Sequence, residues 1–243
     1  MSNYICRLNE NCKKRACPLL QPIRYSLGGR SIYGKNYGSE TEHMAVIVGA
    51  PYGGVKEQGP CVYANELAQR GFIVLTFDPC YMGESAGEPR HVSSPDLFSE
   101  NISAGVDYLG LLPYVDREKI AAIGICGSGG FSLSAAQVDT RIKAVVTASM
   151  YDISAASRLG ADKESLQKTK ERLSEQRWVD AENGYPEWIP SYPEEPVEKV
   201  PEGLDLVSDE FYRFYGVKRG HHPNARAGFY HNKRSGIYQL PTP

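Results

Sequence analysis

Four short apolar runs, separated by helix-like segments, constrain this chain more than any other feature. The runs lie at residues 45–50, 72–78, 119–125 and 142–149. Helical patterns occupy 60–71, 94–112 and the stretch from the glycines after residue 126 to about Val138. The apolar residues of each run are consecutive rather than alternating, which indicates strands covered on both faces. Strand and helix alternating at this spacing predict parallel βαβ units and therefore an α/β fold.

The pattern changes after Ser149. A charged helical stretch at 162–178 is followed by a proline-rich segment at 185–201 and an aromatic one at 210–216. We expect a core at 1–150, a cap or lid at 151–223 and an irregular tail at 224–243. The nearest later strand patterns, at 204–207 and 237–240, are weak. The sheet is therefore predicted to lack its last strands.

Charge and hydropathy exclude several classes of partner. The 243 residues carry a net charge of −2, which gives no reason to expect nucleic acid or an anionic membrane surface. No apolar run approaches the roughly 18 residues that span a bilayer. The first twenty residues contain no secretory apolar segment, so we expect a cytoplasmic protein with reduced thiols. Cys6, Cys12 and Cys17 match no zinc spacing, and neither a metal nor a cofactor is expected.

The third apolar run ends in AAIGICGSGG, residues 121–130, where a cysteine follows a strand and precedes a helix. A nucleophile elbow needs this arrangement, with small residues two positions before and two after the nucleophile. For Cys126 those positions are Gly124 and Ser128. The N-terminus of the following helix would face the sulfur and favour the thiolate, and the Gly127 N–H would bind an oxyanion.

Other interpretations of this segment stay open. In a second register Ser128 is the nucleophile, flanked by Cys126 and Gly130; we favour Cys126 because it directly follows the strand. Cys126 is otherwise a small buried thiol, since free cysteine is among the most buried residue types. A phosphate-binding loop would require a lysine after the last glycine, and none is present.

Two earlier loops would meet the elbow at the carboxyl edge of the sheet, where open α/β sheets bind ligands. The loop GAPYGG, residues 49–54, is placed to supply a second oxyanion donor, for which we choose the Tyr52 N–H; a plain tight turn is the alternative. The loop DPCYMGES, residues 78–85, contributes Asp78, Gly83 and Ser85. Asp78 is predicted to order its loop rather than to act in catalysis.

Together these three loops resemble the α/β-hydrolase superfamily, whose D-x-x-x-x-G-x-S pattern matches the middle loop. A cysteine at the elbow resembles the dienelactone hydrolase branch. More narrowly, PYGGVKEQ, FDPCYMGESAGEPR, VDREKIAAIGICGSGG, KAVVTASMYD, RWVDAENG and RGHHP resemble a bacterial group of uncharacterised dienelactone-hydrolase-like proteins, over about residues 41–223. The resemblance implies a doubly wound, mostly parallel sheet with a cap, and acyl transfer to water from esters, lactones or related bonds.

The resemblance fails at both ends. Residues 1–38 do not match the family's opening strands, and after Pro223 the strands that carry the family's catalytic acid and histidine are not recognisable. We therefore expect a truncated chain, for which a frameshift near residue 223 is one cause. Within the chain, Asp152 is the candidate acid, with a helix N-cap as its alternative role. His222 is the candidate base, with cap packing as its alternative.

The sequence thus predicts a hydrolase in which Cys126 attacks the carbonyl of a small-molecule ester or lactone. The alternatives are an inactive, incomplete hydrolase domain that binds ligands, and a redox-sensing thiol. A sheet that lacks strands exposes an edge, which predicts self-association and a possible homo-oligomer.

Overall fold

The computed structural model describes residues 12–20, 26–34, 42–184, 186–190, 193, 195–225 and 228–230. Its main element is a six-stranded sheet in the order β1-β2-β4-β3-β5-β6. The strands are β1 (Cys12–Leu20), β2 (Ser26–Gly34), β3 (His43–Gly49), β4 (Ile73–Phe77), β5 (Val115–Ile125) and β6 (Ile142–Ala148). Strands β4, β3, β5 and β6 are mutually parallel, which confirms the predicted α/β fold with a parallel sheet.

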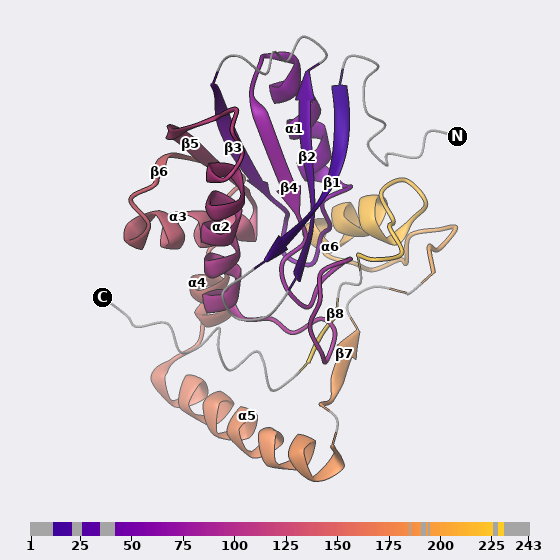
Figure 1. Ribbon diagram of the computed structural model, residues 1–243. Coiled ribbons are helices and arrows are strands. Elements are labelled where there is room, and N and C mark those ends of the chain that lie inside the picture. Colours follow the sequence, from indigo (N-terminus) through magenta and orange to yellow (C-terminus); the bar gives the residue numbers. More distant parts are fainter. Residues whose placement is uncertain are drawn as a thin grey trace.

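Helices connect the parallel strands and cover both faces of the sheet (Figure 1). They are α1 (Gly59–Gln69), α2 (Pro95–Gly110) and α3 (Gly127–Val138). Proline lies within the first turn of both α1 and α2, where its missing N–H and fixed φ cost nothing. All three helices lie where the sequence predicts them, within about two residues at each end.

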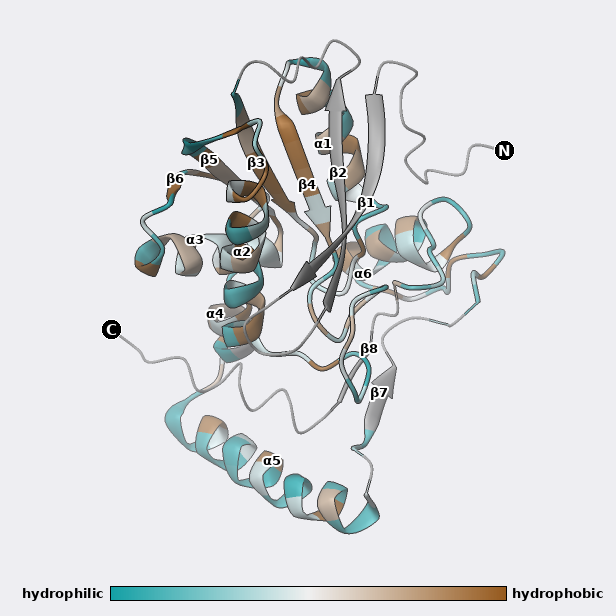
Figure 2. Cartoon of the chain, in the orientation of Figure 1, coloured by the Kyte–Doolittle hydropathy of each residue, from teal (hydrophilic) through white to brown (hydrophobic). Residues whose placement is uncertain are grey.

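Alternate residues of β3 and β4 pack on opposite faces of the sheet. Ile47 and Leu75 contact the side covered by α2, whereas Val46 and Val74 contact α1. These side chains are buried, and β3 and β4 are among the most apolar segments in Figure 2. Burial on both faces is therefore the physical reason for the consecutive apolar runs.

The opening of the chain differs from the sequence interpretation. Residues 1–38 showed no match to opening strands, yet β1 and β2 form an antiparallel pair that joins β4 through β2. The β1 sequence CKKRACPLL has neither a clear alternation nor an apolar run, so it gives little strand signal. Pairing with an existing sheet edge, rather than local propensity, accounts for these strands.

The chain beyond β6 is mostly helical. It contains α4 (Ile153–Arg158), α5 (Lys163–Asn183), the short strand β7 (Trp188–Pro190), α6 (Leu206–Phe211), the π-helix η1 (Tyr212–Gly216) and the short strand β8 (Gly228–Tyr230). The weak strand expected at 204–207 is wrong: the Asp205 carboxylate caps α6 by accepting the Val207 and Ser208 N–H groups. The strand expected at 237–240 lies outside the described residues.

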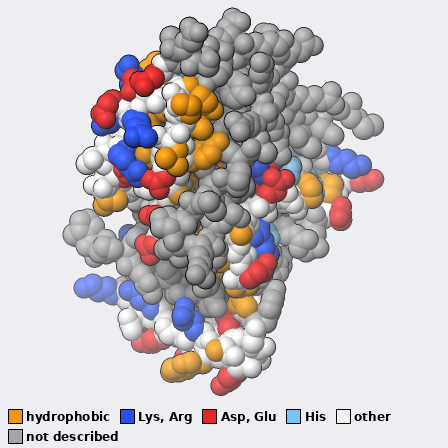
Figure 3. Space-filling view, viewed as in Figure 1, with side chains coloured by type: hydrophobic (Ala, Val, Ile, Leu, Met, Phe, Trp, Pro, Cys, Tyr) orange, Lys and Arg blue, Asp and Glu red, His pale blue; other side chains and the backbone are white. Residues whose placement is uncertain are grey.

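Helix α5 contributes little to the core. Leu173 and Asp180 are its buried residues, and Figure 1 shows it lying away from the sheet. It is largely hydrophilic in Figure 2, and charged side chains of both signs lie over the lower part of the face in Figure 3. Among the described helices, none is long and apolar enough to cross a membrane.

Strand β6 forms one edge of the sheet as the structure describes it. Its exposed residues include Val146, whose exposed fraction is 54%. Met150 and Tyr151, just after the strand, are also exposed. Within the described part of the chain, no strand pairs with the outer side of β6, and its exposed side chains are both apolar and polar.

Candidate functional site

Cys126 lies at the turn between β5 and α3, in a backbone conformation that a side chain rarely adopts. Its φ is 54° and its ψ is −120°. Its N–H donates to the Ala148 carbonyl, and its own carbonyl accepts the Gly129 and Tyr151 N–H groups. These bonds hold a strained turn at the point where the chain leaves the sheet. The side chain is half-buried.

The small residues around Cys126 are required by close contacts. A Cβ atom on Gly124 would lie 2.2 Å from the Ser128 carbonyl oxygen and 2.5 Å from the Gly129 Cα. A Cβ atom on Gly129 would lie 2.7 Å from Met150 Cγ. The turn therefore closes on itself too tightly for any larger residue at Gly124.

Ser128, the nucleophile of the competing register, points into the protein. Its side chain is 6% exposed, and its hydroxyl donates to the Ala50 carbonyl. A Cβ atom on Gly49 would lie 2.8 Å from Ser128 Cβ, so the serine packs directly under the end of β3. This geometry supports Cys126 over Ser128 as the reactive residue.

Tyr52 lies opposite the first residue of α3. A Cβ atom on Gly127 would be 2.9 Å from Tyr52 Cβ, so the two backbones approach closely. The Tyr52 ring packs edge-on against Phe98, with 6.3 Å between ring centroids, and contacts Phe131 at 6.4 Å. Its hydroxyl hydrogen-bonds the Ser93 hydroxyl. The ring and hydroxyl of Tyr52 thus anchor the loop, and its Cβ lies against Gly127.

Asp78, directly after β4, orders two loops at once. Its buried carboxylate accepts the Lys56 N–H and the Glu84 N–H, each at 2.9 Å. Gly83, with φ +51°, lets the loop wrap the carboxylate, because a Cβ there would lie 2.2 Å from Asp78 Oδ2. The Ser85 hydroxyl donates to the Asp78 carbonyl at 2.5 Å. This is the loop-ordering role that the sequence favours for Asp78.

Lys56 is the residue of the site that sequence reasoning missed. Its side chain is 1% exposed, and its Nζ lies 2.6 Å from Asp78 Oδ2, 2.9 Å from Glu84 Oε2 and 3.0 Å from Glu57 Oε1. Burial lowers the pKa of Lys56, but the Asp78 carboxylate and its neighbours outweigh burial and raise it above its usual value. We call Lys56, Glu57, Asp78 and Glu84 the Lys56 cluster. A lysine in a glycine-rich loop gives no sign of this burial, because two of its three partners, Asp78 and Glu84, lie on another loop.

Asp152 and His222, the acid and base predicted from the sequence, make hydrogen bonds elsewhere. The Asp152 side chain is exposed and accepts the Ala155 N–H at 2.8 Å, which makes it the N-cap of α4. His222 Nδ1 accepts the Asn224 N–H at 3.2 Å. Burial lowers the pKa of His222, against the charges of Glu57 and Asp78 in the Lys56 cluster. Neither residue has a hydrogen bond to Cys126 within the described part of the chain.

The aromatic cap segment contains a half-buried tyrosine, Tyr215. Burial, with a smaller contribution from Cys126, raises the pKa of Tyr215. The Tyr215 ring stacks edge-on against Phe214 at 4.8 Å and Phe211 at 6.2 Å between centroids. The cap segment is attached to the core through Gln58, whose Nε2 donates to the Gly220 carbonyl at 2.6 Å.

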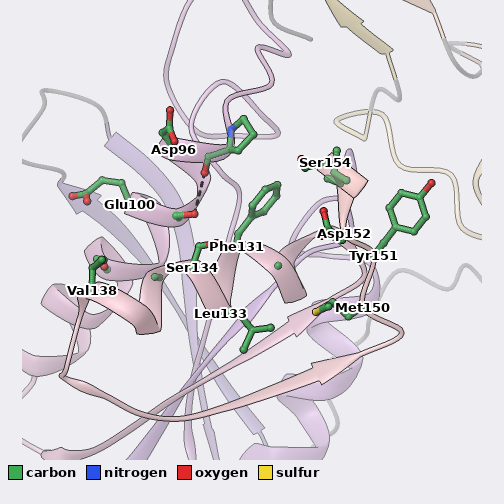
Figure 4. Close-up of a pocket in the computed structure, with 17 residues that line it drawn as sticks. Asp96, Glu100, Phe131, Leu133, Ser134, Val138, Met150, Tyr151, Asp152 and Ser154 are labelled. Carbon is green, nitrogen blue, oxygen red and sulfur yellow. Dashed lines mark hydrogen bonds between the residues drawn. The ribbon is translucent and has the colours of Figure 1, made fainter. Parts of the chain in front are cut away.

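An open groove of about 460 Å³ runs along α3 (Figure 4). Asp96 and Glu100 of α2 lie at one end, Tyr151 and Asp152 at the other, and Phe131 between them. Gly127 lines the groove, whereas Cys126 is not among its described lining residues. The groove therefore lies behind the elbow rather than over the sulfur.

The described residues contain no group of three or more His, Cys, Asp and Glu side chains that could hold a metal ion. The described residues bring together the Cys126 thiol, a close approach of Tyr52 to Gly127, and the ion pairs of the Lys56 cluster.

Known proteins resemble this chain in sequence and in fold. The uncharacterized protein PA2218 of Pseudomonas aeruginosa is 47% identical over 185 residues, which cover 74% of this chain and 48% of the relative. The crystal structure of PA2218 superposes with a TM-score of 0.89 and 37% identity, over 97% of this chain and 74% of that one. The chain thus spans about half the length of the curated relative in the sequence alignment.

Two further proteins bear on the fold and on the family. The crystal structure of the α/β-hydrolase GrgF from Penicillium has a TM-score of 0.72 at 20% identity, over 94% of this chain and 73% of that one, which shows the shared fold. Thiohydrolase aneE of Aspergillus aculeatus is 30% identical over 122 residues, which cover 50% of this chain and 38% of the relative. No protein-family model matches the chain. The sheet, the strand–turn–helix elbow and the likeness to GrgF show an α/β-hydrolase-type fold, and the likeness to PA2218 shows that the chain belongs to the family that includes PA2218.

Proposed function

We propose that this protein is a hydrolase whose nucleophile is Cys126. The observation that carries the proposal is the backbone of Cys126, which has a φ of 54° at the end of β5. Holding a non-glycine residue in this region costs free energy, on the order of 1–3 kcal/mol. An inert buried thiol would not require that cost, whereas a nucleophile presented above the sheet edge does.

The reaction begins when the Cys126 thiolate attacks the carbonyl carbon of the substrate. A C–S bond forms, and the carbonyl π electrons move onto oxygen. The oxyanion then collapses, the bond to the leaving group breaks, and the leaving group departs with a proton. Water adds to the resulting acyl-enzyme, releases the carboxylic acid and restores the thiol.

The backbone amides of Gly127 and Tyr52 are the proposed oxyanion donors. Gly127 begins α3, so its N–H is among those that have no partner within the helix. The close approach of Tyr52 to Gly127 supports a shared site for one oxygen atom. Such donors act on charge that develops in the transition state, and each contributes about 10²–10³ in kcat.

The candidate acid and base, Asp152 and His222, have other surroundings in the structure. Asp152 already caps α4, and His222 lies beside the Lys56 cluster. Cysteine depends on a general base less than serine does, because its thiolate is already accessible near neutral pH. Acylation of Cys126 can therefore proceed without either residue, while deacylation by water is the slower step.

We propose a small-molecule ester, lactone or thioester as substrate. The name of the thiohydrolase relative supports a thioester. The aromatic residues of the cap, including Phe214 and Tyr215, support an apolar acyl group near the thiol.

The test is covalent labelling of the nucleophile. Incubation with p-nitrophenyl acetate, and separately with an acetyl thioester, should add one acetyl group to the protein, and tandem mass spectrometry should place it on Cys126. Cys126→Ala should remove the label. Ser128→Ala is the control for the competing register and should keep it. Acetylation of Ser128, or none at Cys126, would refute the proposed mechanism.

A further inference from the structure

We propose that Lys56 is a positioning residue: its pairing with Asp78 fixes the loop that carries the Tyr52 amide to the oxyanion site. The inference rests on the proposed function, in which that amide binds the developing oxyanion. It concerns the Lys56 cluster, in which Lys56, Glu57 and Asp78 are buried and Glu84 is half-exposed, and which has no hydrogen bond to the thiol in the described part of the chain.

Lys56 binds one carboxylate twice. Its backbone N–H donates to Asp78 Oδ1 at 2.9 Å, and its Nζ donates to Asp78 Oδ2 at 2.6 Å. Asp78 follows β4, which is paired in parallel register with β3. The double contact therefore fixes the far end of the loop after β3 to the end of the neighbouring strand.

The near end of the same loop is fixed to the elbow. The Ala50 carbonyl accepts the Ser128 hydroxyl, directly within the turn that holds Cys126. Between Ala50 and Lys56 the chain is short and tightly turned: the Gly54 N–H donates to the Pro51 carbonyl at 2.8 Å, and Gly53 has a φ of 81°. Tyr52 lies on this bridge, against Gly127. A displacement of Lys56 is therefore passed to the Tyr52 amide.

The charge on Lys56 is essential to this anchor. Asp78 is 0% exposed, and the Lys56 ammonium is the cation that pairs with it among the described side chains. Removing the ammonium leaves a buried carboxylate without its counter-charge, and the loop would rearrange to admit water. A small displacement of a catalytic donor lowers the reaction rate strongly, since a misplacement of about 1 Å can reduce the rate on the order of 100-fold.

The main experiment compares Lys56→Met with the wild type and with Lys143→Met. Lys143 pairs with Glu118 on the surface at 2.9 Å, so it controls for loss of an ion-paired lysine. Acetylation of Cys126 by p-nitrophenyl acetate should slow by about 10- to 100-fold in Lys56→Met, and stay within about twofold in Lys143→Met. Alkylation of Cys126 by iodoacetamide needs no oxyanion donor, so its rate in Lys56→Met should differ from the wild type by less than about threefold.

A double variant separates positioning from stability. Lys56→Met with Asp78→Asn removes the unpaired charge, so its thermal midpoint should return toward the wild type while acetylation stays slow. Recovery of the acetylation rate together with stability would overturn the inference, because the role of Lys56 would then be structural only.

Hydrogen exchange provides a measurement that does not depend on turnover. The amides of Ala50 and of residues 52–55 should exchange faster in the double variant than in the wild type. Unchanged exchange there overturns the inference even if the wild-type protein shows no acetylation, an outcome that would count separately against the proposed function.

Discussion

At the scale of single residues, the elbow depends on small side chains at the positions around Cys126. Cys126 holds a positive φ because Gly124 lets the following turn fold back over it, and Ser128 fits beneath Gly49 without filling the space above the sheet. Each position is limited by an interatomic contact rather than by a preference for a residue type. Substitutions here therefore act on folding as well as on reactivity.

Gly124→Ala tests that limit. The added methyl would meet the Ser128 carbonyl oxygen at 2.2 Å, a backbone atom that cannot move aside. We expect a loss of about 2–4 kcal/mol in the free energy of unfolding, measured by urea denaturation. Gly110→Ala is the matched control, since its nearest new contact is Arg117 at 3.9 Å. A loss at Gly124 no larger than at Gly110 would contradict the packing described for the elbow.

Asp152 can be tested for two roles with two variants. Asparagine caps helices as well as aspartate does, so Asp152→Asn should leave stability unchanged, whereas Asp152→Ala should lose about 1 kcal/mol on thermal or urea unfolding. If capping is its whole role, acetylation of Cys126 is the same in both variants. Slower acetylation in the stable Asp152→Asn variant would instead support the catalytic acid predicted from the sequence.

At the scale of elements, α5 differs from the helices that cover the sheet. Leu173 and Asp180 are its buried side chains, and Asp180 also accepts the Glu187 N–H at 3.0 Å, which fixes the C-terminal end of the helix. An element with so few buried apolar contacts opens locally at low free energy. Trypsin cleaves after lysine and arginine, so it can cut α5 when the helix opens.

We therefore expect limited trypsin digestion to cut within α5 before it cuts β3 to β5. Leu173→Ala should speed this cleavage by about five- to thirtyfold, the factor that 1–2 kcal/mol of local stability represents. Leu159→Ala, at a leucine that is 87% exposed, is the control and should have no effect. The cleavage sites are read from the masses of the fragments. First cleavage between β3 and β5 would show that α5 is held more firmly than its contacts indicate.

At the scale of the whole molecule, we expect the edge at β6 to control self-association. The strand carries one charged residue, Lys143, and apolar or β-branched residues elsewhere, so it can pair with another strand. We expect concentration-dependent self-association, measured by sedimentation equilibrium. Val146→Lys should weaken it by tenfold or more, while Val138→Lys, at an exposed valine on α3, should not. A monomer at all concentrations would contradict this expectation.

The sequence predicts the parallel strands, their helices and the elbow because each depends on local patterns: apolar runs, a proline in the first turn, glycines at a tight turn. It does not reveal β1 and β2, whose pairing is set by the edge of β4, nor α6, whose Asp205 cap outweighs the weak strand pattern of 204–207. The sequence does not predict the burial of Lys56 for a related reason. Its sequence neighbours indicate a solvated loop, and only the tertiary approach of Asp78 buries its charge.

The hydrogen bond from Gln58 to Gly220 joins residues 162 positions apart. During synthesis the chain up to β6 can fold before Gly220 has left the ribosome, because domains form from the N-terminus as they emerge. The turn at Cys126 is then assembled while the aromatic cap segment is still being made. We therefore expect a stage of synthesis at which the turn at Cys126 has formed and the cap segment is not yet attached, and oxidants or electrophiles would reach the thiol most easily at that stage.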